Sequence, residues 1–353
     1  MKINKYKFIH IIKNDKFINE FYNFIIENFP SDEHLFIYVV GQPESKFTIP
    51  EAENVINLNN QYKGLMKSLR LSKILQPYCD GAEKIIFHSF YAKDIVRFLF
   101  FNQKFLSKSY WVMWGVDLYN YSLKVSTIKS LLNYVMAKNL KGRFAGYITY
   151  LKEDYSIAEK EYSAKGEFYE CLMYPSNLYK EYGVKDKDKK FINIQVGNSA
   201  DRTNNHLEVL RKLLPFKDEN IRIYVPLSYG SKENANQVIK QGLNWFGDKF
   251  IPLTEFIPFE EYLKLLGTID IAIFNHKRQQ AMGNTITLLG LGKTVYIRRD
   301  TSQWEFFTEK GINVRDIEKL NDLGFSKEER NIEVVKTYFS KSNFLKQLRE
   351  LFT

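Results

Sequence analysis

A stretch at residues 191–213 combines glycine, small polar residues and an arginine in an order that suits phosphate binding. Its sequence, FINIQVGNSADRTNNHLEVLRKL, runs from an apolar segment into a polar turn and then into a helical pattern. Backbone N–H groups in such a turn can approach a phosphate closely, and an arginine can pair with two oxygens of a diphosphate. The simpler alternative is that Ser199, Asp201 or Thr203 caps the helix. The residues expected to contact a diphosphate here are Gly197, Asn198, Ser199 and Arg202.

A second stretch, IAIFNHKRQQAMGNTITLLGLGKTVYIRRD at residues 271–300, places cations and amides before a helix. An apolar segment ends at Phe274, a basic loop follows, and a helix is expected to open at residues 283–285. The start of a helix has partial positive charge and free N–H donors, so this loop is a second expected contact for the diphosphate. The alternative is an ordinary basic loop before a capped helix. The expected contacts are Lys277, Arg278, Gln279, Gln280, Gly283, Asn284 and Thr285.

Aromatic residues crowd around one acid in YWVMWGVDLYNY, residues 110–121. Aromatic faces beside a carboxylate can hold a sugar and activate one of its hydroxyls, so we expect Asp117 to act as general base on an acceptor. His88, at the end of the preceding apolar segment, is the second candidate for this role. The alternative is that the aromatics are core, that Asp117 is a cap or a structural ion pair, and that His88 is a hydrogen-bonded structural residue. The expected acceptor contacts are Trp114, Gly115 and Tyr119.

The turn in LTEFIPFEEYL, residues 253–263, supplies candidates for contact with a nucleotide base. Apolar side chains stand here between a strand-like segment and a helical pattern, where ligands of α/β proteins bind. The expected contacts with the base are Phe256, Ile257 and Pro258.

Short apolar runs alternate with helical patterns along the whole chain, which is typical of an α/β fold. Runs this apolar indicate strands buried on both faces, hence parallel sheets with crossover helices. A charged stretch with proline and glycine separates two such series and predicts a linker. Two Rossmann-like domains joined in this way have their parallel sheets facing across a cleft, where ligands bind. The expected parts are an N-terminal domain at 1–175, the linker at 176–190, a C-terminal domain at 191–325, and C-terminal helices at 326–353 that could return to the first domain.

Composition indicates a folded protein of a reducing compartment. Hydrophobic residues make up 44% and aromatic residues 16% of the 353 positions, enough for two cores. Two cysteines cannot form a disulfide framework, and the N-terminus lacks the cleavage site of a signal peptide. Charges interrupt every apolar run before it reaches the roughly 20 residues that a membrane span requires. The protein is therefore expected to be soluble or peripheral.

Much of the net charge of +10 comes from the stretch between Asp94 and Glu153, where Asp117 is the one acid. Its cations alternate with aromatic residues, a combination that attracts anionic lipid and can sit at the level of the headgroups. Nucleic acid would be attracted as well, and a solvated lysine-rich surface is the simplest alternative. We expect an anionic membrane surface, and no nucleic acid, as a partner. The cations are Arg97, Lys104, Lys108, Lys124, Lys129, Lys138, Lys141, Arg143 and Lys152.

Several uncommon strings of the sequence occur in the order and spacing of a known family. The chain resembles the TDP-N-acetylfucosamine:lipid II N-acetylfucosaminyltransferases, glycosyltransferase family 56, from about residue 84 to 315. Ala200 stands where the family leads us to expect a glycine, and Ala281-Met282 also diverges, which bears on the donor sugar more than on the reaction. The strings are WGVDLY at 114–119, VGNSADRTNNH at 196–206, VPLSYG at 225–230, FNHKRQQAMGNT at 274–285 and QWEF at 303–306.

The resemblance implies a GT-B fold, with the donor nucleotide in the C-terminal domain and the acceptor in the N-terminal one. It also implies a polyprenyl-diphosphate-linked saccharide acceptor at the cytoplasmic face of the bacterial inner membrane, in surface polysaccharide assembly. The enzyme would be a peripheral hexosyltransferase that moves a sugar such as N-acetylfucosamine from a nucleotide diphosphate. No cofactor or metal is expected, because amides and cations would stabilise the leaving diphosphate. The alternatives are a nucleotide-sugar epimerase of similar fold and a non-catalytic nucleotide or nucleic-acid binder.

Overall fold

The computed structural model describes residues 6–15, 17–40, 47–58, 65–119, 128–181 and 190–353. The chain divides into two compact units, which we call unit 1 and unit 2. Unit 1 comprises Met1–Ser176 together with Lys341–Thr353, and unit 2 comprises Asn177–Ser340. Most of the expected linker, residues 182–189, lies outside the described residues.

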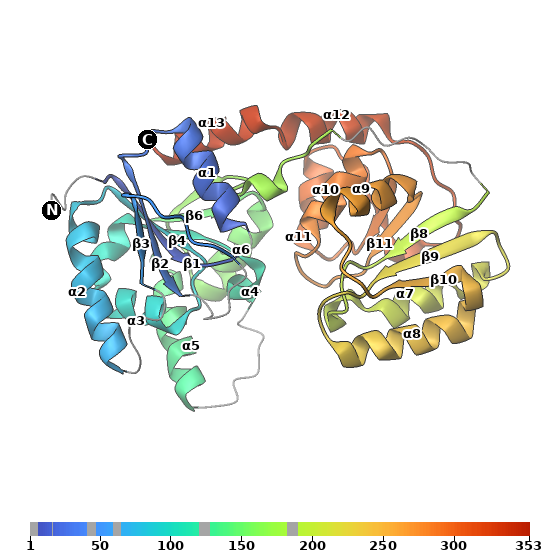
Figure 1. Ribbon diagram of the computed structural model, residues 1–353, viewed down its shortest axis with the longest axis horizontal. Helices are drawn as coiled ribbons and strands as arrows, with labels where there is room; N and C mark the ends of the chain where they lie inside the picture. Colours follow the sequence, from blue (N-terminus) through green and yellow to red (C-terminus); the bar gives the residue numbers. More distant parts are fainter. Residues whose placement is uncertain (1–5, 16, 41–46, 59–64, 120–127, 182–189) are drawn as a thin grey trace. The chain divides into compact units, whose positions relative to one another are not determined.

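Unit 1 is built on a seven-stranded sheet with the order β3-β2-β1-β4-β5-β6-β7, in which all neighbouring strands are parallel. Helices cover both of its faces, α1 and α13 on one and α2, α3 and α5 on the other (Figure 1). The strands are β1 Phe8–Lys13, β2 His34–Val40, β3 Val55–Asn57, β4 Lys84–His88, β5 Ser109–Val112, β6 Gly146–Thr149 and β7 Glu167–Glu170. The helices are α1 Ile18–Asn28, α2 Leu65–Gly81, α3 Lys93–Phe101, α4 Gly115–Leu118, α5 Ile128–Lys141, α6 Lys152–Tyr162 and α13 Lys341–Leu351.

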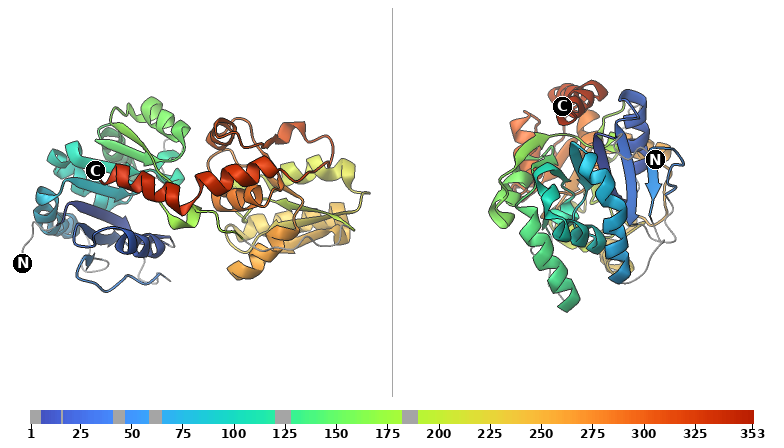
Figure 2. Two further views of the ribbon diagram at one scale, coloured as in Figure 1. Left: turned by 90° about the horizontal axis from the view of Figure 1, so that it is seen from above. Right: turned by 90° about the vertical axis from the view of Figure 1, so that its left-hand side faces the viewer.

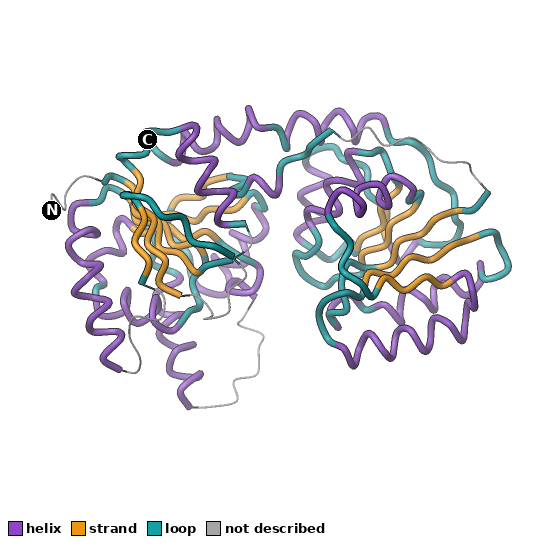
Figure 3. Tube along the Cα trace, viewed as in Figure 1, coloured by secondary structure: helices purple, strands orange, loops and turns teal. Residues whose placement is uncertain are grey.

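Unit 2 has a six-stranded parallel sheet with the order β10-β9-β8-β11-β12-β13. In Figure 3 the strands of each unit form a central layer between helices. The strands are β8 Ile192–Val196, β9 Ile221–Pro226, β10 Phe250–Leu253, β11 Ile271–Phe274, β12 Thr294–Ile297 and β13 Arg315–Asp316. The helices are α7 His206–Leu213, α8 Lys232–Phe246, α9 Phe259–Thr268, α10 Met282–Gly290, α11 Ser302–Glu309 and α12 Glu329–Tyr338.

The apolar runs of the sequence form these strands because both faces of each sheet are covered. Every residue of β11 and of β12 is buried, and in β1 all but the last are. Residues with this pattern cannot face water on either side, which is the condition that favours parallel strands joined by helices. The structure thus confirms the predicted fold class, two parallel-sheet α/β domains.

The C-terminal residues divide between the two units. Helix α12 belongs to unit 2 and α13 to unit 1, and Figure 2 shows the two red helices following each other along the chain. Helix α13 is anchored in unit 1 by polar and apolar contacts. The Gln347 Oε1 atom accepts a hydrogen bond from the Leu172 amide at 2.9 Å, and the Phe344 ring lies 4.8 Å from that of Phe24. In the described residues, no helix is long and apolar enough to cross a membrane.

The strand order of each sheet reverses once, and this point determines where a ligand can enter. In unit 1 the reversal lies between β1 and β4, and in unit 2 between β8 and β11. The chain leaves two neighbouring strands in opposite directions at such a point, which opens a crevice at their carboxyl ends. The residues that directly follow these strands are therefore the first to consider as site residues.

Candidate functional site in unit 2

Both predicted phosphate loops begin at the reversal point of unit 2. Strand β8 ends at Val196 and is followed by Gly197, and the neighbouring strand β11 ends at Phe274 and is followed by Asn275. The Gly197 amide donates a hydrogen bond to the Ile273 carbonyl at 3.0 Å. The structure therefore brings together two stretches that are about eighty residues apart in the sequence.

Gly197 occupies a position that only glycine fits. Its φ angle is 68°, in the left-handed region, and an added Cβ atom would lie 2.7 Å from the His206 Nε2 atom and 2.8 Å from the Asn204 Oδ1 atom. The same Asn204 oxygen accepts the Asn198 amide at 2.9 Å and lies 2.9 Å from the His276 Nε2 atom. Hydrogen bonds to the Asn204 side chain thus hold the turn after β8 in a fixed shape.

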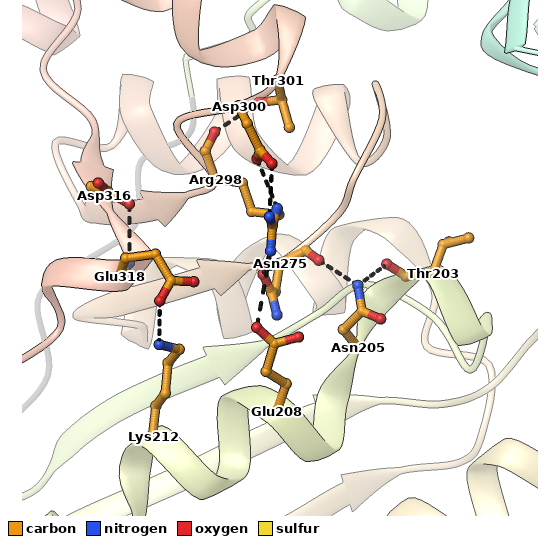
Figure 4. Close-up of polar contacts among 10 residues, drawn as sticks. All are labelled: Thr203, Asn205, Glu208, Lys212, Asn275, Arg298, Asp300, Thr301, Asp316 and Glu318. Atoms are coloured by element: carbon orange, nitrogen blue, oxygen red, sulfur yellow. Dashed lines mark hydrogen bonds and ion pairs between the residues drawn. The ribbon is translucent and has the colours of Figure 1, made fainter.

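Side chains connect this turn to the loop after β11. The Thr203 hydroxyl lies 2.7 Å from the Gln280 side-chain amide, and the Asn205 Nδ2 atom donates to the Asn275 carbonyl at 2.8 Å. Figure 4 shows Asn205 between Thr203 and Asn275, with Arg298 of the following strand end close by. The two loops therefore form one rigid rim around the reversal point.

Arg298 braces the rim from the side of β12. Its Nε and Nη2 atoms each donate to the Asp300 carboxylate at 2.8 Å, its Nη1 atom lies 3.4 Å from the Asn275 Oδ1 atom, and Glu208 of α7 is 3.9 Å away. These contacts run through the centre of Figure 4. The charge of Arg298 is already paired with carboxylates, so it positions the loop rather than offering a free cation.

A pocket of about 220 Å³ opens beside this rim, within unit 2. Its walls come from the ends of β8, β9 and β10 and from the starts of α9 and α10, the carboxyl edge of the sheet. Most of the wall is apolar or aromatic, with a few polar groups, the usual character of a small-molecule site. The residues that line it are Asn198, Pro226, Ser228, Tyr229, Leu253, Glu255, Phe256, Ile257, Tyr262 and Asn284.

The Tyr262 hydroxyl is set up as a hydrogen-bond donor to this pocket. Its oxygen accepts from the Gln195 Nε2 atom at 3.3 Å and from the Asn284 Nδ2 atom at 3.1 Å, and burial raises the pKa of Tyr262, so the hydroxyl keeps its proton. Among the described residues no acceptor takes that proton. If the Asn284 amide is turned over, its oxygen accepts the proton and its NH₂ group faces the pocket instead. In either arrangement the pocket offers a donor, so it suits a ligand with acceptor oxygens.

The predicted diphosphate contacts fall into two groups. Lys277 is exposed, Arg278 is half-buried with Nη1 3.2 Å from the Gln279 carbonyl, and Asn284 lines the pocket. By contrast, the Ser199 and Thr285 side chains are buried and used within the protein. The Ser199 oxygen accepts the Asn204 Nδ2 atom at 3.2 Å, and the Thr285 hydroxyl donates to the Ala281 carbonyl at 3.0 Å. The contacts predicted at these two positions are backbone amides. The Thr285 amide is also used within the protein, because it donates to the Ala281 carbonyl at 2.9 Å, whereas contact through the Ser199 amide stays a prediction.

Arg202 lies on the surface of unit 2. Its Nη2 atom is 2.5 Å from the Glu233 carboxylate, and two thirds of its side chain is exposed. Surface ion pairs of this kind contribute little to stability and exchange partners readily. Arg202 is thus available to an anion, although it does not line the pocket in this structure.

Helix α10 starts with free amides at the rim. Its first residue is Met282, and Ala281 before it has a φ of 59° and no side chain that could cap the helix. The amides of the first turn are left without a capping side chain, and the partial positive charge of the helix start faces the same side. Gly283 is exposed there, as the sequence predicts for a phosphate contact.

Two buried histidines lie behind the rim. His206 and His276 are 2% and 1% exposed, and burial lowers the pKa of His206 to about 4 and that of His276 to about 3. Within the described residues, neither ring nitrogen of His206 has a hydrogen-bond partner, and the His276 Nδ1 atom has none. Buried polar atoms are seldom left unpaired, so these nitrogens mark a place that water or a ligand completes.

In unit 1 the structure corrects the predicted role of Asp117. Its carboxylate is 0% exposed and accepts three hydrogen bonds, from the Phe90 amide at 2.6 Å, the Trp111 Nε1 atom at 2.7 Å and the Trp114 amide at 2.7 Å. Burial raises the pKa of Asp117 to about 6, while the ammonium of Lys141 opposes the rise. A base must reach the proton it removes. This carboxylate instead holds the ends of β4 and β5 in place.

His88, the second candidate base, lies in a buried hydrogen-bond chain. Its Nδ1 atom is 2.8 Å from the Tyr174 hydroxyl and its Nε2 atom 3.0 Å from the His10 Nδ1 atom, and the His10 Nε2 atom is 3.1 Å from the His34 Nδ1 atom. Burial lowers the pKa of all three histidines. The Tyr174 hydroxyl also accepts the Trp114 Nε1 proton at 2.9 Å. Both ring nitrogens of His88 and of His10 thus have partners inside the protein, and the chain is structural in this geometry.

The predicted acceptor contacts lie near the end of β5. Trp114 and Gly115 are half-buried, and the Tyr119 hydroxyl donates to Asp154 at 2.9 Å. Ser89, which follows β4 at the reversal point of unit 1, was not predicted. Its φ is 73°, and its buried hydroxyl has no partner among the described residues. A non-glycine residue in this conformation is strained, which is common at functional sites.

Sequence reasoning missed most of the pocket wall. Glu255 and Tyr262 both lie in the string LTEFIPFEEYL, from which only Phe256, Ile257 and Pro258 were predicted. Tyr262 lies in the first turn of a helix that looks like an ordinary amphipathic one. Ser228 and Tyr229 belong to VPLSYG, which contributed to the family resemblance but was not predicted to be part of a site. That string follows β9 directly, and this position at the carboxyl end of a strand was the available signal. In the described part of the chain, no group of three metal-binding side chains gathers.

Comparison with known proteins agrees with this architecture. A trehalose-phosphate synthase from Burkholderia xenovorans in complex with glucose-6-phosphate is 8% identical, with a TM-score of 0.64 over 98% of this chain and 99% of that one. The Escherichia coli trehalose-6-phosphate enzyme bound with UDP-2-fluoro glucose is 9% identical, with a TM-score of 0.61 over 98% of both chains. These glycosyltransferases have the GT-B fold, and at such low identity the likeness establishes the fold. The family described as 4-alpha-L-fucosyltransferase, glycosyl transferase group 56, matches residues 9–352. The chain therefore belongs to glycosyltransferase group 56 and is a glycosyltransferase of GT-B fold.

Proposed function

We propose that unit 2 binds a nucleoside diphosphate sugar, with the base in the pocket and the diphosphate on the rim. The observation that carries this proposal is the pocket at the reversal point, which joins an apolar wall to hydrogen-bond donors. Phe256 at its edge is 84% exposed, far more than a large aromatic ring usually is, and it could stack on a base. Ile257 lines the same wall, and Pro258 is the residue directly before helix α9.

The rim supplies positive potential where the leaving group would gain charge. As the bond between the sugar carbon and the diphosphate oxygen breaks, negative charge develops on that oxygen. Donors fixed in advance at that point are usually the largest contribution to catalysis. The amides after β8 and at the start of α10 lie on this rim, with Lys277 and Arg278 between them in sequence.

We propose that the sugar is an N-acetylated amino-deoxy hexose such as N-acetylfucosamine, and that the acceptor is a polyprenyl-diphosphate-linked saccharide. Membership of group 56 supports this assignment. The acceptor oxygen forms the new bond to the sugar carbon, the nucleoside diphosphate leaves, and the hydroxyl proton passes to a base or to water. Trp114, Gly115 and Tyr119, at the carboxyl edge of unit 1, are the proposed acceptor contacts. The reaction would take place at the cytoplasmic face of the bacterial inner membrane.

Nucleotide binding is the first test. In a thermal-shift series with TDP, UDP and GDP, one nucleotide should raise the melting temperature in proportion to the logarithm of its concentration. Arg278→Ala should raise the Kd for that nucleotide about tenfold, the worth of one charge-assisted contact. Arg202→Ala should raise it less, because its side chain is two thirds exposed and already paired with Glu233. Lys240→Ala, on the exposed face of α8, is the matched control. If none of the three nucleotides binds, the donor assignment is wrong.

The reaction itself separates transfer from epimerisation. Incubation with a TDP-linked amino-deoxy sugar and a polyprenyl-diphosphate disaccharide should give a longer lipid-linked saccharide, measured by mass spectrometry. An epimerase would alter the nucleotide sugar without any acceptor. A product in which only the nucleotide sugar has changed would contradict the proposal.

A further inference from the structure

Helix α5 of unit 1 has an apolar face that is exposed. Leu131, Leu132 and Val135 are 48%, 59% and 55% exposed. With about 100° of rotation per residue, these three side chains lie within one arc of about 100° on the helix. Leu140 and Ala137 on the other side are buried against α3 and the sheet. Helix α5 is therefore apolar on two sides, of which the fold buries one.

This concentration is unusual among the helices of the described chain. Helix α8 of unit 2 is of similar length, and its one exposed large aliphatic side chain is Leu243 at 47%. Single exposed leucines are normal in folded proteins, whereas a contiguous exposed group marks a surface of interaction.

The exposed face lies at the edge of unit 1 where a ligand would bind. The Asn133 Nδ2 atom donates to the carbonyl of Tyr91, three residues after β4, at 3.4 Å. Residues before Asn133 therefore extend past the carboxyl edge of the sheet. Both Figure 1 and the right view of Figure 2 show the start of α5 projecting beyond α3. The leucines thus stand next to the edge that carries the proposed acceptor contacts.

The charge around this face is positive. From residue 95 to 152 the one acid, Asp117, is 0% exposed, so no exposed carboxylate of this stretch opposes an anion. Lys138 follows Val135 on the same side of α5 and is exposed, and Arg143 is exposed just after the helix. Lys104 is different, because Asp80 pairs with it at 2.7 Å. Aliphatic side chains beside unopposed cations are the chemistry that a bilayer with anionic headgroups complements.

We propose that the face formed by Leu131, Leu132, Val135 and Lys138, called here the α5 face, docks on an anionic lipid bilayer. The leucines and the valine enter the headgroup region, and Lys138 stays at the level of the phosphates. Three side chains are too small a patch for a stable protein interface, which buries about 800 Å² on each partner. They also lack the aromatic rings on which nucleic acid bases stack. The inference rests on the proposed function only in explaining why the acceptor edge should face lipid.

Vesicle flotation tests the α5 face. The full chain should float with vesicles of phosphatidylcholine and phosphatidylglycerol and much less with phosphatidylcholine alone. The variant L131Q/L132Q/V135T should lower the partition coefficient at least about tenfold, and Lys138→Gln about fivefold. Leu243→Gln, which removes an equally exposed leucine from unit 2, is the matched control and should leave flotation unchanged. Glutamine is a good helix former, so α5 should persist, as circular dichroism can check.

Other outcomes would overturn the inference. Equal flotation of the triple variant would show that the face does not meet lipid. A lowered melting temperature with unchanged flotation would mean that another part of the chain covers it, and loss of a dimer in light scattering would mean a second copy does. Binding to single-stranded DNA that the triple variant loses would point to nucleic acid. The nucleotide thermal shift is independent of vesicles, so a failure of donor binding with intact flotation would count against the proposed function alone.

Discussion

The two units share one architecture, yet the polar groups at their reversal points differ in whether they have hydrogen-bond partners. In unit 1 the polar groups near the ends of β4 and β5 find partners inside the protein. Asp117 accepts three hydrogen bonds, and His88 is held between Tyr174 and His10. In unit 2 the corresponding edge keeps a pocket and, as far as the described residues go, a tyrosine hydroxyl without an acceptor and two histidines with unpaired nitrogens. Buried polar atoms that stay unpaired cost stability, so they persist where a ligand completes them.

The comparison teaches that polar residues at a strand end do not by themselves identify a binding site. The types of residue at the end of β5 resemble those of a sugar site, but their hydrogen bonds are used to hold the edge. Ser89, directly after β4, differs from these groups, since its buried hydroxyl has no partner among the described residues and its backbone is strained. Ser89 is thus a better candidate for acceptor contact than Asp117, although Asp117 is the more conspicuous residue in the sequence.

The largest expected effect is that of acid on all five histidines, each of which is buried. Their folded pKa values lie below the usual 6.5, about 4 for His34 and His206 and about 3 for His88 and His276. The unfolded state therefore binds more protons between pH 6.5 and about 4, and stability is lost as the pH falls through this window. At pH 5 the loss is about 2 kcal/mol for each of these four histidines.

Asp117 works in the opposite direction. Its pKa is raised to about 6 from 3.8, so protonation below pH 6 stabilises the folded state by about 1 kcal/mol at pH 5. The histidines still dominate, so the free energy of unfolding should fall between pH 7 and pH 5, and urea unfolding at the two pH values measures the change.

A bound nucleotide should protect unit 2 from acid, because its phosphates favour protonated His206 and His276, and should not protect unit 1. A flat stability profile between pH 7 and 5 would contradict the burial of the histidines.

Asp117→Ala should be the most destabilising single substitution in unit 1. It leaves three buried N–H donors without an acceptor and a buried Lys141 without its nearby charge, at a cost of about 3–5 kcal/mol. Guanidinium denaturation followed by tryptophan fluorescence measures the loss. If the variant has near-normal stability but no sugar transfer, Asp117 is a catalytic base after all. The polar groups at the edge of unit 1 would then not be purely structural.

Gly197→Ala should affect both the stability and the nucleotide affinity of unit 2. The new Cβ atom meets His206 and Asn204 at under 3 Å while the backbone is in the left-handed region. We expect a loss of about 2 kcal/mol in the free energy of unfolding and at least about a tenfold rise in the Kd for nucleotide. Gly247→Ala is the control, because its φ is also positive and its Cβ would meet no atom within 4 Å. Equal effects of the two variants would assign the loss to backbone strain alone.

Phe256→Ala should weaken nucleotide binding without changing stability. The ring is 84% exposed, so its removal costs no core packing, whereas a lost stacking contact is worth about 1 kcal/mol and hence about fivefold in Kd. Phe101→Ala, which removes a ring that is 69% exposed in unit 1, is the matched control. Isothermal titration with the nucleotide that binds best compares them. If both variants bind as the wild type does, the base lies elsewhere.

Ala281→Gly should have the smallest effect. A φ of 59° strains alanine by about 1 kcal/mol, and most of that gain is offset by the greater freedom of glycine in the unfolded chain, so stability should rise by about 0.5 kcal/mol or less. Nucleotide affinity should not fall, since the amides at the start of α10 remain. Thermal unfolding with and without nucleotide measures both. A clear loss of affinity would show that the methyl group itself contacts the donor.

Much of the fold follows directly from the sequence. The alternation of fully apolar runs such as FIHIIK and IAIF with helical patterns predicts two parallel sheets, because only strands covered on both faces have that composition. The positions of the loops after β8 and β11 were also visible, since glycine and polar residues directly after an apolar run mark the carboxyl end of a strand. The strings around them led to the family that the whole-chain match confirms.

The tertiary structure alone decided which polar groups are free. The sequence presents Asp117 as the lone acid of a basic stretch, and nothing in that pattern reveals that Phe90, Trp111 and Trp114 use up its oxygens. It also gives no sign that Tyr262 meets Gln195 and Asn284, which come from other elements. Residue type and spacing determine what chemistry a side chain can do. Whether it is free to do that chemistry depends on contacts between distant segments, which only the folded chain makes.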